Sequence, residues 1–316
     1  MLYPKTSIAG GSSRIALLLA FFVIYVVWGS TYLAIRYAVE TIPPLLVVGI
    51  RQGLAGVAIF AWVYARGFRP TLREWRASVV LGILYFVISH GLLHWAETVV
   101  PSGLAALLIA SEPIWIAIMA AVISREERFT LKTGFGLLVG LAGVALLMGE
   151  EAGAGHGRLL LGCTAILISA FTWAVGVIYS RNPNLPRDPV ARAGMAALTG
   201  SILLLAAALA TGEMSYSHFT AFSARSVWSL LYLIVFGTIL AFTTYTWLLD
   251  HCSPTLVSTH TYANPIIAVL LGWWLAGERL DIRVLFAGVL TLVSVFLISR
   301  GTGERVALAP QVDEAA

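Results

Sequence analysis

The sequence predicts an all-α integral membrane protein whose ten transmembrane helices form two inverted-topology five-helix repeats. The first observation is composition, because 59% of the 316 residues are hydrophobic and only 11% are charged, whereas a soluble domain carries about 25% charged residues. The second is a series of ten apolar runs, each able to cross a bilayer core of about 30 Å at about 1.5 Å per helical residue. The third is an internal repeat of polar and aromatic landmarks.

Short polar or proline-marked connections separate the apolar runs. The first run is too long for a signal-peptide core and lacks a small-residue cleavage site, so we expect a retained span. The expected spans are residues 15–36, 44–65, 77–97, 101–124, 132–149, 159–180, 190–211, 226–249, 255–276 and 283–299. They give a first repeat over 1–150, a second over 156–300 and a disordered cytoplasmic tail over 301–316.

The positive charges of the loops predict the orientation. Fourteen Lys and Arg residues fall on the side that holds both ends of the chain, five fall on the other, and Arg51 lies within a span. By the positive-inside rule, both termini are cytoplasmic in a multi-pass protein of the cell inner (plasma) membrane. The net charge of +4 therefore reports membrane orientation, and we expect no nucleic-acid partner.

Polar and aromatic residues at matching positions in the two halves indicate an internal repeat. A shift of 145 residues pairs Trp28 with Trp173, and a shift of 152 pairs Glu112-Pro113 with Asn264-Pro265. Five spans per half is an odd number, so the second half enters the membrane from the opposite side. Inverted repeats of this kind are used for alternating access around a site near the middle of the membrane.

Glu112 is the candidate for coupling. It lies near the middle of the fourth span, where a carboxyl group is costly and can exchange a proton, and the adjacent proline removes a helix hydrogen bond. We expect helix breaks at Pro113 and Pro265. The alternative role for Glu112 is to cap the backbone freed by Pro113. Asn264 cannot titrate, so any proton coupling is asymmetric between the halves.

The third span carries His90, His94 and Glu97 at i, i+4 and i+7, on one helical face. The favoured interpretation is a polar cavity wall that opens to the outside. Two alternatives are a metal site, since HxxxH places two imidazoles on one face, and a histidine that carries protons. With only two His and one Glu available, we expect no metal and no cofactor.

Other spans supply further candidates for the cavity. In the ninth span, His260, Tyr262 and Asn264 either line the cavity or join helices by hydrogen bonds. Aromatic residues either wall a cavity for amphipathic solutes or belong to the interfacial belts. Arg51 either snorkels or pairs within the scaffold, or it binds a substrate carboxylate. The residues expected at the cavity are Trp28, Thr31, Tyr32, His90, His94, Glu112, Trp173, Trp247, His260, Tyr262 and Asn264.

Several strings in this sequence resemble the EamA branch of the drug/metabolite transporter superfamily. They are Trp28-Gly29-Ser30-Thr31-Tyr32, Pro43-Pro44 followed by Arg51, Val100-Pro101-Ser102-Gly103, and Gly277-Glu278-Arg279. The resemblance covers residues 15–300 and implies a 5+5 inverted repeat with a central cavity. It also implies secondary transport, commonly export of amino acids, metabolites or drugs. His90 departs from the pattern, which has Asn at this position after a small residue.

The predicted function is a secondary transporter that exports small organic metabolites, such as amino acids or amphipathic drugs, by alternating access. A proton is the expected coupling ion if transport is coupled. The sequence has no Walker motif, nucleophile elbow or zinc hydrolase signature, so no enzyme activity is expected. The alternatives are a membrane-embedded transferase acting on a lipid or isoprenoid, and a non-transporting scaffold. The expected partners are the small-molecule substrate and membrane lipid, with the protein a monomer or a homodimer.

Overall fold

The computed structural model describes residues 11–119, 123, 130–148, 157–216, 221–252, 254–258, 260–277 and 282–303. All regular secondary structure in these residues is helical. Within the described ranges, six helices are long and apolar enough to cross a membrane, and shorter apolar helices cover Ser102–Ile116 and Ala263–Ala276. The all-helical class is confirmed, while the number of ten spans stays a prediction.

The first half contains seven α-helices and one π-helix among its described residues. They are α1 (Gly11–Ala38), α2 (Pro44–Ala65), α3 (Leu72–Gly82), the π-helix η1 (Ile83–His90), α4 (Gly91–Ala96), α5 (Ser102–Ile109), α6 (Glu112–Met119) and α7 (Leu131–Met148). The residues at the N-terminal ends of several helices explain where those helices begin. Pro44 opens α2, where a missing N–H costs nothing, and Thr71 forms a capping box with Glu74 before α3.

The second half follows a similar order. Its elements are α8 (Gly157–Tyr179), α9 (Pro189–Ala210), α10 (Glu213–Tyr216), α11 (Ala224–Tyr232), the π-helix η4 (Leu233–Leu240), α12 (Ala241–His251), α13 (Pro254–Val257), α14 (His260–Ala276) and α15 (Ile282–Gly303). The Asp188 carboxylate accepts from two backbone N–H groups at the start of α9. Helix α15 extends to Gly303, so the first residues of the predicted tail are helical, and 304–316 lie outside the described residues.

The two π-helices occupy corresponding places in the two halves. Each is eight residues long, η1 between α3 and α4 and η4 between α11 and α12. A π-helix bonds i to i+5 and therefore takes more residues per turn than an α-helix, and such segments occur frequently at functional sites. Sequence periodicity predicted neither segment.

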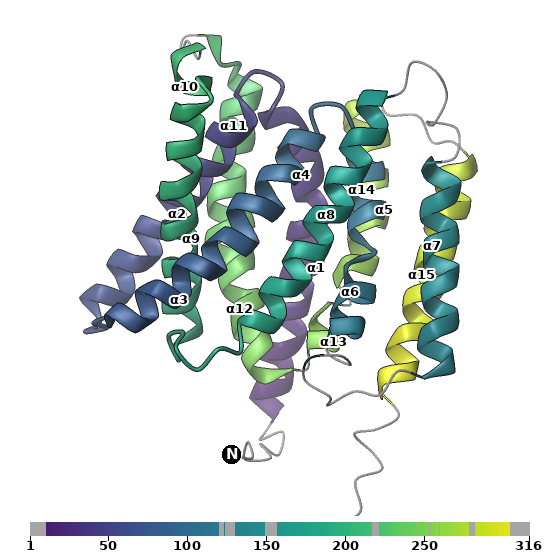
Figure 1. Ribbon diagram of the computed structural model, residues 1–316, viewed down its shortest axis with the longest axis horizontal. Coiled ribbons are helices and arrows are strands. Elements are labelled where there is room, and N and C mark those ends of the chain that lie inside the picture. The colour runs from purple at the N-terminus through teal and green to yellow at the C-terminus, as the bar shows by residue number, and fades with distance from the viewer. Residues whose placement is uncertain are drawn as a thin grey trace, which may run out of the picture.

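Helices of one half pack against helices of the other in a reciprocal pattern. Helix α2 lies along its counterpart α9, and α7 lies along α15 (Figure 1). The contact of α1 with α14 corresponds to that of α8 with α5 and α6. This reciprocal pattern is the one expected of two repeats related by a pseudo-twofold axis. The inverted orientation of the repeats, and their bounds, stay predictions.

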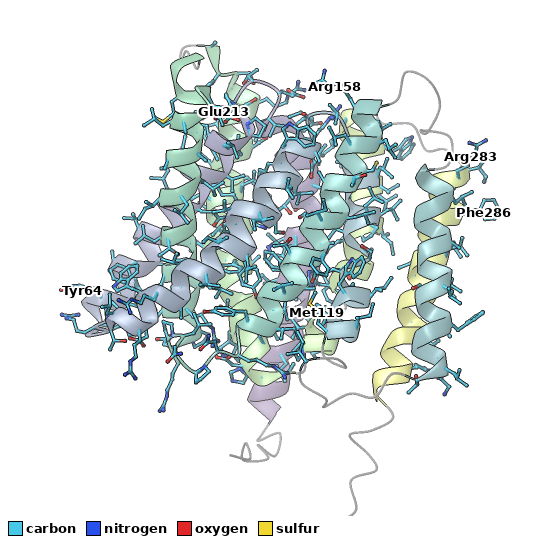
Figure 2. The ribbon with its side chains drawn as sticks, viewed as in Figure 1. Tyr64, Met119, Arg158, Glu213, Arg283 and Phe286 are labelled. Carbon is cyan, nitrogen blue, oxygen red and sulfur yellow. The ribbon has the colours of Figure 1, made fainter. Side chains whose placement is uncertain are left out.

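The outer surface of the bundle is apolar. Large hydrophobic side chains point away from the helices, as Figure 2 shows for Phe286 on α15, which is 60% exposed. Trp228 and Trp274 are also exposed, at 72% and 73%. A soluble monomer rarely exposes so many large apolar groups together, so this surface is suited to contact lipid tails.

The predicted break in the fourth span is present. Helix α5 ends at Ile109, Ala110 and Ser111 form a turn, and α6 begins at Glu112. Pro113 is then the second residue of α6, in the first turn, where a backbone N–H has no intrahelical acceptor. The Ser111 hydroxyl donates back to the Leu108 carbonyl (2.7 Å), which satisfies one acceptor at the end of α5.

The corresponding prediction at Pro265 is wrong. Helix α14 runs from His260 through Pro265 to Ala276. The helical structure of this span is interrupted earlier, between the end of α13 at Val257 and the start of α14. Pro265 removes a single backbone donor near the start of α14, and membrane helices tolerate such a loss when neighbouring helices support them. Helix α14 packs along α1, which supplies that support.

Candidate functional site

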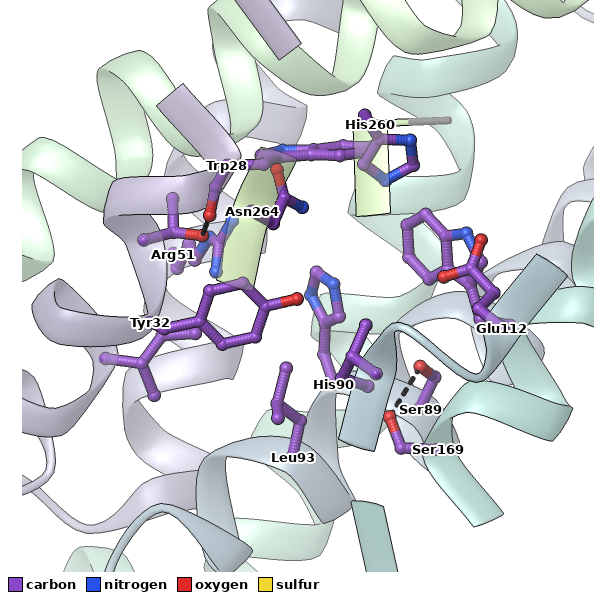
Figure 3. Close-up of a pocket in the computed structure, with 14 residues that line it drawn as sticks. Trp28, Tyr32, Arg51, Ser89, His90, Leu93, Glu112, Ser169, His260 and Asn264 are labelled. Carbon is purple, nitrogen blue, oxygen red and sulfur yellow. Dashed lines mark hydrogen bonds between the residues drawn. The ribbon is translucent and has the colours of Figure 1, made fainter. Parts of the chain in front are cut away.

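A polar cavity lies at the centre of the bundle, between the two halves. Helices α1, α2, α4, α5, α6, α8 and α14 and the π-helix η1 contribute to its wall (Figure 3). The second half of the chain supplies two residues from α8 and two from α14. The lining residues are Trp28, Thr31, Tyr32, Ile35, Arg51, Ser89, His90, Leu93, Ile109, Glu112, Ser169, Trp173, His260 and Asn264.

The cavity is small in this conformation. Its volume of about 60 Å³ holds a few water molecules, whereas pockets for organic ligands have about 300–1,000 Å³. Binding of an organic solute therefore requires the surrounding helices to move apart.

Aromatic rings form one wall of the cavity. The Trp28 ring lies 5.8 Å from that of Trp173 and 4.8 Å from that of His260, both edge-on. The His90 ring stacks on Trp173 at 5.3 Å with an interplanar angle of 11°. The Trp28 indole N–H donates to the carbonyl of Gly237 in η4 (3.1 Å), which fixes this ring across the two halves. The wall offers stacking surfaces to a planar or apolar solute.

Arg51 lies at one side of the cavity and is 3% exposed. Its Nε donates to the Thr238 hydroxyl (2.9 Å) in η4, and its Nη1 lies 3.5 Å from Nε2 of His94. A Cβ atom at Gly237 would come within 2.8 Å of Arg51 Nη2, so the glycine makes room for the guanidinium. Within the described part of the chain, Arg51 has no carboxylate within salt-bridge distance.

Glu112 lies on the other side of the cavity from Arg51, with His90 between them in Figure 3. It is the first residue of α6 and is 3% exposed. Its buried Oε1 has no hydrogen-bond partner among the described residues. The expectation that Glu112 caps freed backbone therefore gains no support from this geometry.

The two polar residues of α14 are fixed by backbone groups. The His260 Nδ1–H donates to the Val257 carbonyl (2.9 Å). The Asn264 amide nitrogen, turned to face two carbonyl oxygens, donates to His260 (2.9 Å) and to Tyr25 of α1 (3.2 Å). Asn264 thus both lines the cavity and joins α14 to α1.

Eight of the residues expected at the cavity lie on its wall, and three do not lie on it or are not described. The eight are Trp28, Thr31, Tyr32, His90, Glu112, Trp173, His260 and Asn264. His94 is fully buried behind the wall, where its Nδ1 donates to the His90 carbonyl (2.8 Å) and its Nε2 faces Arg51. The Tyr262 side chain lies outside the described residues.

Trp247 was expected at the central cavity, and this expectation is wrong. Its ring stacks on His251 at 4.0 Å and lines a separate surface hollow with residues of α1, α9 and α12. The prediction rested on the depth of Trp247 in the eighth span and on its match with Trp95 in the repeat. The π-turns of η4 shift the phase of every residue that follows, which turns Trp247 away from the cavity.

Glu97 was expected on the same face as His90 and His94. It is buried at the end of α4, and Arg36 donates to its backbone carbonyl (2.8 Å). Across the described residues, no group of three His, Cys, Asp or Glu side chains is placed to hold a metal ion. His90, His94 and Glu97 therefore do not form such a group in the described structure.

The list of residues expected at the cavity left out Arg51 and two serines that line it. Ser89 and Ser169, from η1 and α8, hydrogen-bond each other across the halves (3.0 Å). Serines carry little signal in an apolar span. Arg51 is a cation seven residues inside its span. Of the two scaffold roles expected for it, the structure shows hydrogen bonds within the bundle and not snorkelling.

Comparisons with known proteins agree with the geometry. A sequence profile described as the EamA-like transporter family matches residues 14–149 and again residues 160–300. The chain is 34% identical to the uncharacterized inner membrane transporter YedA of Escherichia coli (strain K12), over 89% of this chain and 90% of that one. It is 27% identical to the uncharacterized transporter YvbV of Bacillus subtilis (strain 168), over 99% and 98%.

A solved crystal structure of another protein has a similar fold. It superposes with a TM-score of 0.66, covering 90% of this chain and 97% of its own, at 21% sequence identity. At this level of identity the likeness concerns the fold alone.

Proposed function

This chain belongs to the EamA-like transporter family, and we propose that it is a secondary transporter that exports small organic metabolites across the cell inner membrane. The two halves move relative to each other and expose the central cavity to each side of the membrane in turn. The proposed solutes are amino acids or related amphipathic compounds, and the proposed coupling ion is a proton exchanged at Glu112.

The observation that carries the proposal is the composition of the central cavity. Its wall takes Glu112 and His90 from the first half and Trp173, His260 and Asn264 from the second. A site built at the interface of two halves changes its exposure when the halves move. The small volume of the cavity, about 60 Å³, supports a conformation in which both halves have closed on it.

The proposed orientation puts both termini in the cytoplasm, following the excess of Lys and Arg in the loops on that side. The ion pair between Arg192 and Asp250 (2.5 Å) then lies at the cytoplasmic end of α9 and α12. The pair between Arg225 and Glu40 (2.6 Å) lies at the external end of α11 and α1.

Transport by the purified protein in proteoliposomes tests the proposal. Vesicles are loaded with an unlabelled amino acid or amphipathic organic compound, and uptake of the same labelled compound is followed. We expect counterflow for at least one compound of a panel, faster than in protein-free vesicles. Absence of counterflow for every compound, in both directions and at every imposed pH gradient, would refute the proposed function.

A further inference from the structure

We infer that Arg51 binds a carboxylate of the transported solute and thereby selects solutes with one negatively charged group. The inference rests on the proposed function, because it assigns a ligand to the proposed transport cavity. Three features of the structure lead to it, namely the charge of Arg51, the position of its guanidinium, and the chemistry of the rest of the cavity wall.

The charge of Arg51 is buried without a counter-ion in contact with it. A guanidinium stays protonated in proteins, and an isolated charge in an apolar environment is costly unless it is paired. Arg51 is 3% exposed, and within the described residues its hydrogen-bond partners are the neutral side chains of Thr238 and His94. The Glu97 carboxylate acts on this charge through space but forms no salt bridge with it. A carboxylate group of a bound solute supplies a negative charge in direct contact.

Neighbouring side chains hold the guanidinium through Nε and Nη1 and leave Nη2 without a hydrogen bond to the described part of the chain. Thr238 accepts from Nε and His94 faces Nη1, while no described residue accepts from Nη2. His94 donates its Nδ1–H to the His90 carbonyl, so its Nε2 is free to accept from Arg51. The site is thus built from both halves, since Thr238 belongs to η4 and His94 to α4.

Gly237 makes room for the Nη2 atom of Arg51. A Cβ atom at this position would lie 2.8 Å from Nη2, so any larger residue displaces the guanidinium. The Gly237 carbonyl meanwhile accepts from the Trp28 indole (3.1 Å). The same η4 turn therefore positions both the cation and the aromatic ring beside it.

The rest of the wall defines the class of solute. One guanidinium neutralises one negative charge, and a second charge on a phosphate would be buried without a partner, which favours a monocarboxylate. The aromatic wall of Trp28 and Trp173 accommodates an apolar or planar body. A purely cationic solute leaves the Arg51 charge unpaired, so it is disfavoured relative to a solute that carries a carboxylate.

Matched acids and amides test the inference. The probes are phenylalanine with phenylalaninamide, leucine with leucinamide, and phenylacetate with phenylacetamide, each measured as an inhibitor of counterflow and as a ligand in a thermal-shift titration. For the unmodified protein we expect at least one acid to bind about tenfold or more tightly than its amide. Arg51→Gln is expected to abolish this preference, and Arg51→Lys to retain part of it because lysine keeps the charge.

Gly237→Ala is the second variant. It keeps Arg51 but crowds Nη2, so the acid-to-amide preference is expected to fall in a protein whose unfolding temperature shows that it is folded. If Arg51→Gln does not fold, the acid-to-amide preference of Gly237→Ala tests the inference in its place. A preference that survives in Arg51→Gln or Gly237→Ala, or binding of no acid by the unmodified protein, overturns the inference. Transport of acid and amide alike would overturn it while leaving the proposed function standing.

Discussion

Replacing Glu112 with glutamine is expected to abolish export driven by an imposed pH gradient, down to the level of protein-free vesicles. Glutamine keeps the size and hydrogen-bonding capacity of the side chain but cannot exchange a proton. Counterflow at equal pH on both sides does not require net proton movement, so it is expected to persist. The measurement compares pH-driven efflux and counterflow in the same preparation of proteoliposomes.

Glu213→Gln is the matched control for Glu112→Gln. Glu213 lies in α10 between two spans and accepts from the Leu46 backbone N–H (3.2 Å), outside the cavity. The same chemical change there is expected to leave pH-driven export unchanged. Full pH-driven export by Glu112→Gln would show that Glu112 is not the proton-exchanging group. Loss of counterflow as well would assign Glu112 to solute binding instead of coupling.

Replacing Gly56 with alanine is expected to destabilise the protein by about 1–3 kcal/mol, the range for overpacking a tight interface. A Cβ atom at Gly56 would lie 2.7 Å from the backbone nitrogen of Leu198 and 3.0 Å from its Cα. These are backbone atoms of α9, and they cannot move without moving the helix. Because α2 and α9 join the two halves, thermal unfolding in detergent should shift to a lower temperature.

Gly91→Ala provides the matched control. Gly91 is also helical, but a Cβ atom at this position would have its nearest neighbours 3.8 Å away, which is ordinary van der Waals distance. Alanine favours the helix by up to about 1 kcal/mol over glycine, so this variant should be neutral or more stable. Equal unfolding temperatures for the two variants would show that the α2–α9 contact is looser than the structure indicates.

Much of the fold could be predicted from the sequence because lipid imposes simple rules on length and polarity. The prediction of a span over 44–65 coincides with α2 (Pro44–Ala65), since Pro43-Pro44 fixes its start and the charged loop from Arg66 fixes its end. The polar residues Glu112, His260 and Asn264 stand out within apolar runs, and all three lie on the same cavity.

The features that sequence reasoning missed depend on local backbone geometry. A π-turn leaves no clear mark in apolar sequence, so η1 and η4 were not predicted, and Trp247 was placed on the wrong face. Pro113 and Pro265 look alike in the sequence, yet only Pro113 lies in the first turn of a new helix, whereas Pro265 lies inside α14. The role of Arg51 depends on Gly237, which is 186 residues away in the chain, and such a pairing has no local signature.

The central claim is that the cavity between the two halves opens to each side of the membrane in turn. Its most direct test is the reactivity of a cysteine placed on the cavity wall, in the variant Ser169→Cys made in a Cys252→Ser background. A small membrane-impermeant methanethiosulfonate reagent is applied to intact cells and to inverted membrane vesicles. The remaining Cys163, on the same helix but packed in the apolar core and not on the cavity wall, serves as the control in the parent protein.

We predict that the cysteine at 169 is modified from both sides, while the parent protein is modified from neither. Modification from both sides requires a site that each aqueous phase reaches in turn, since in the closed conformation the cavity is too small for the reagent. Modification from only one side, or from neither, in a protein that catalyses counterflow would contradict alternating access through this cavity.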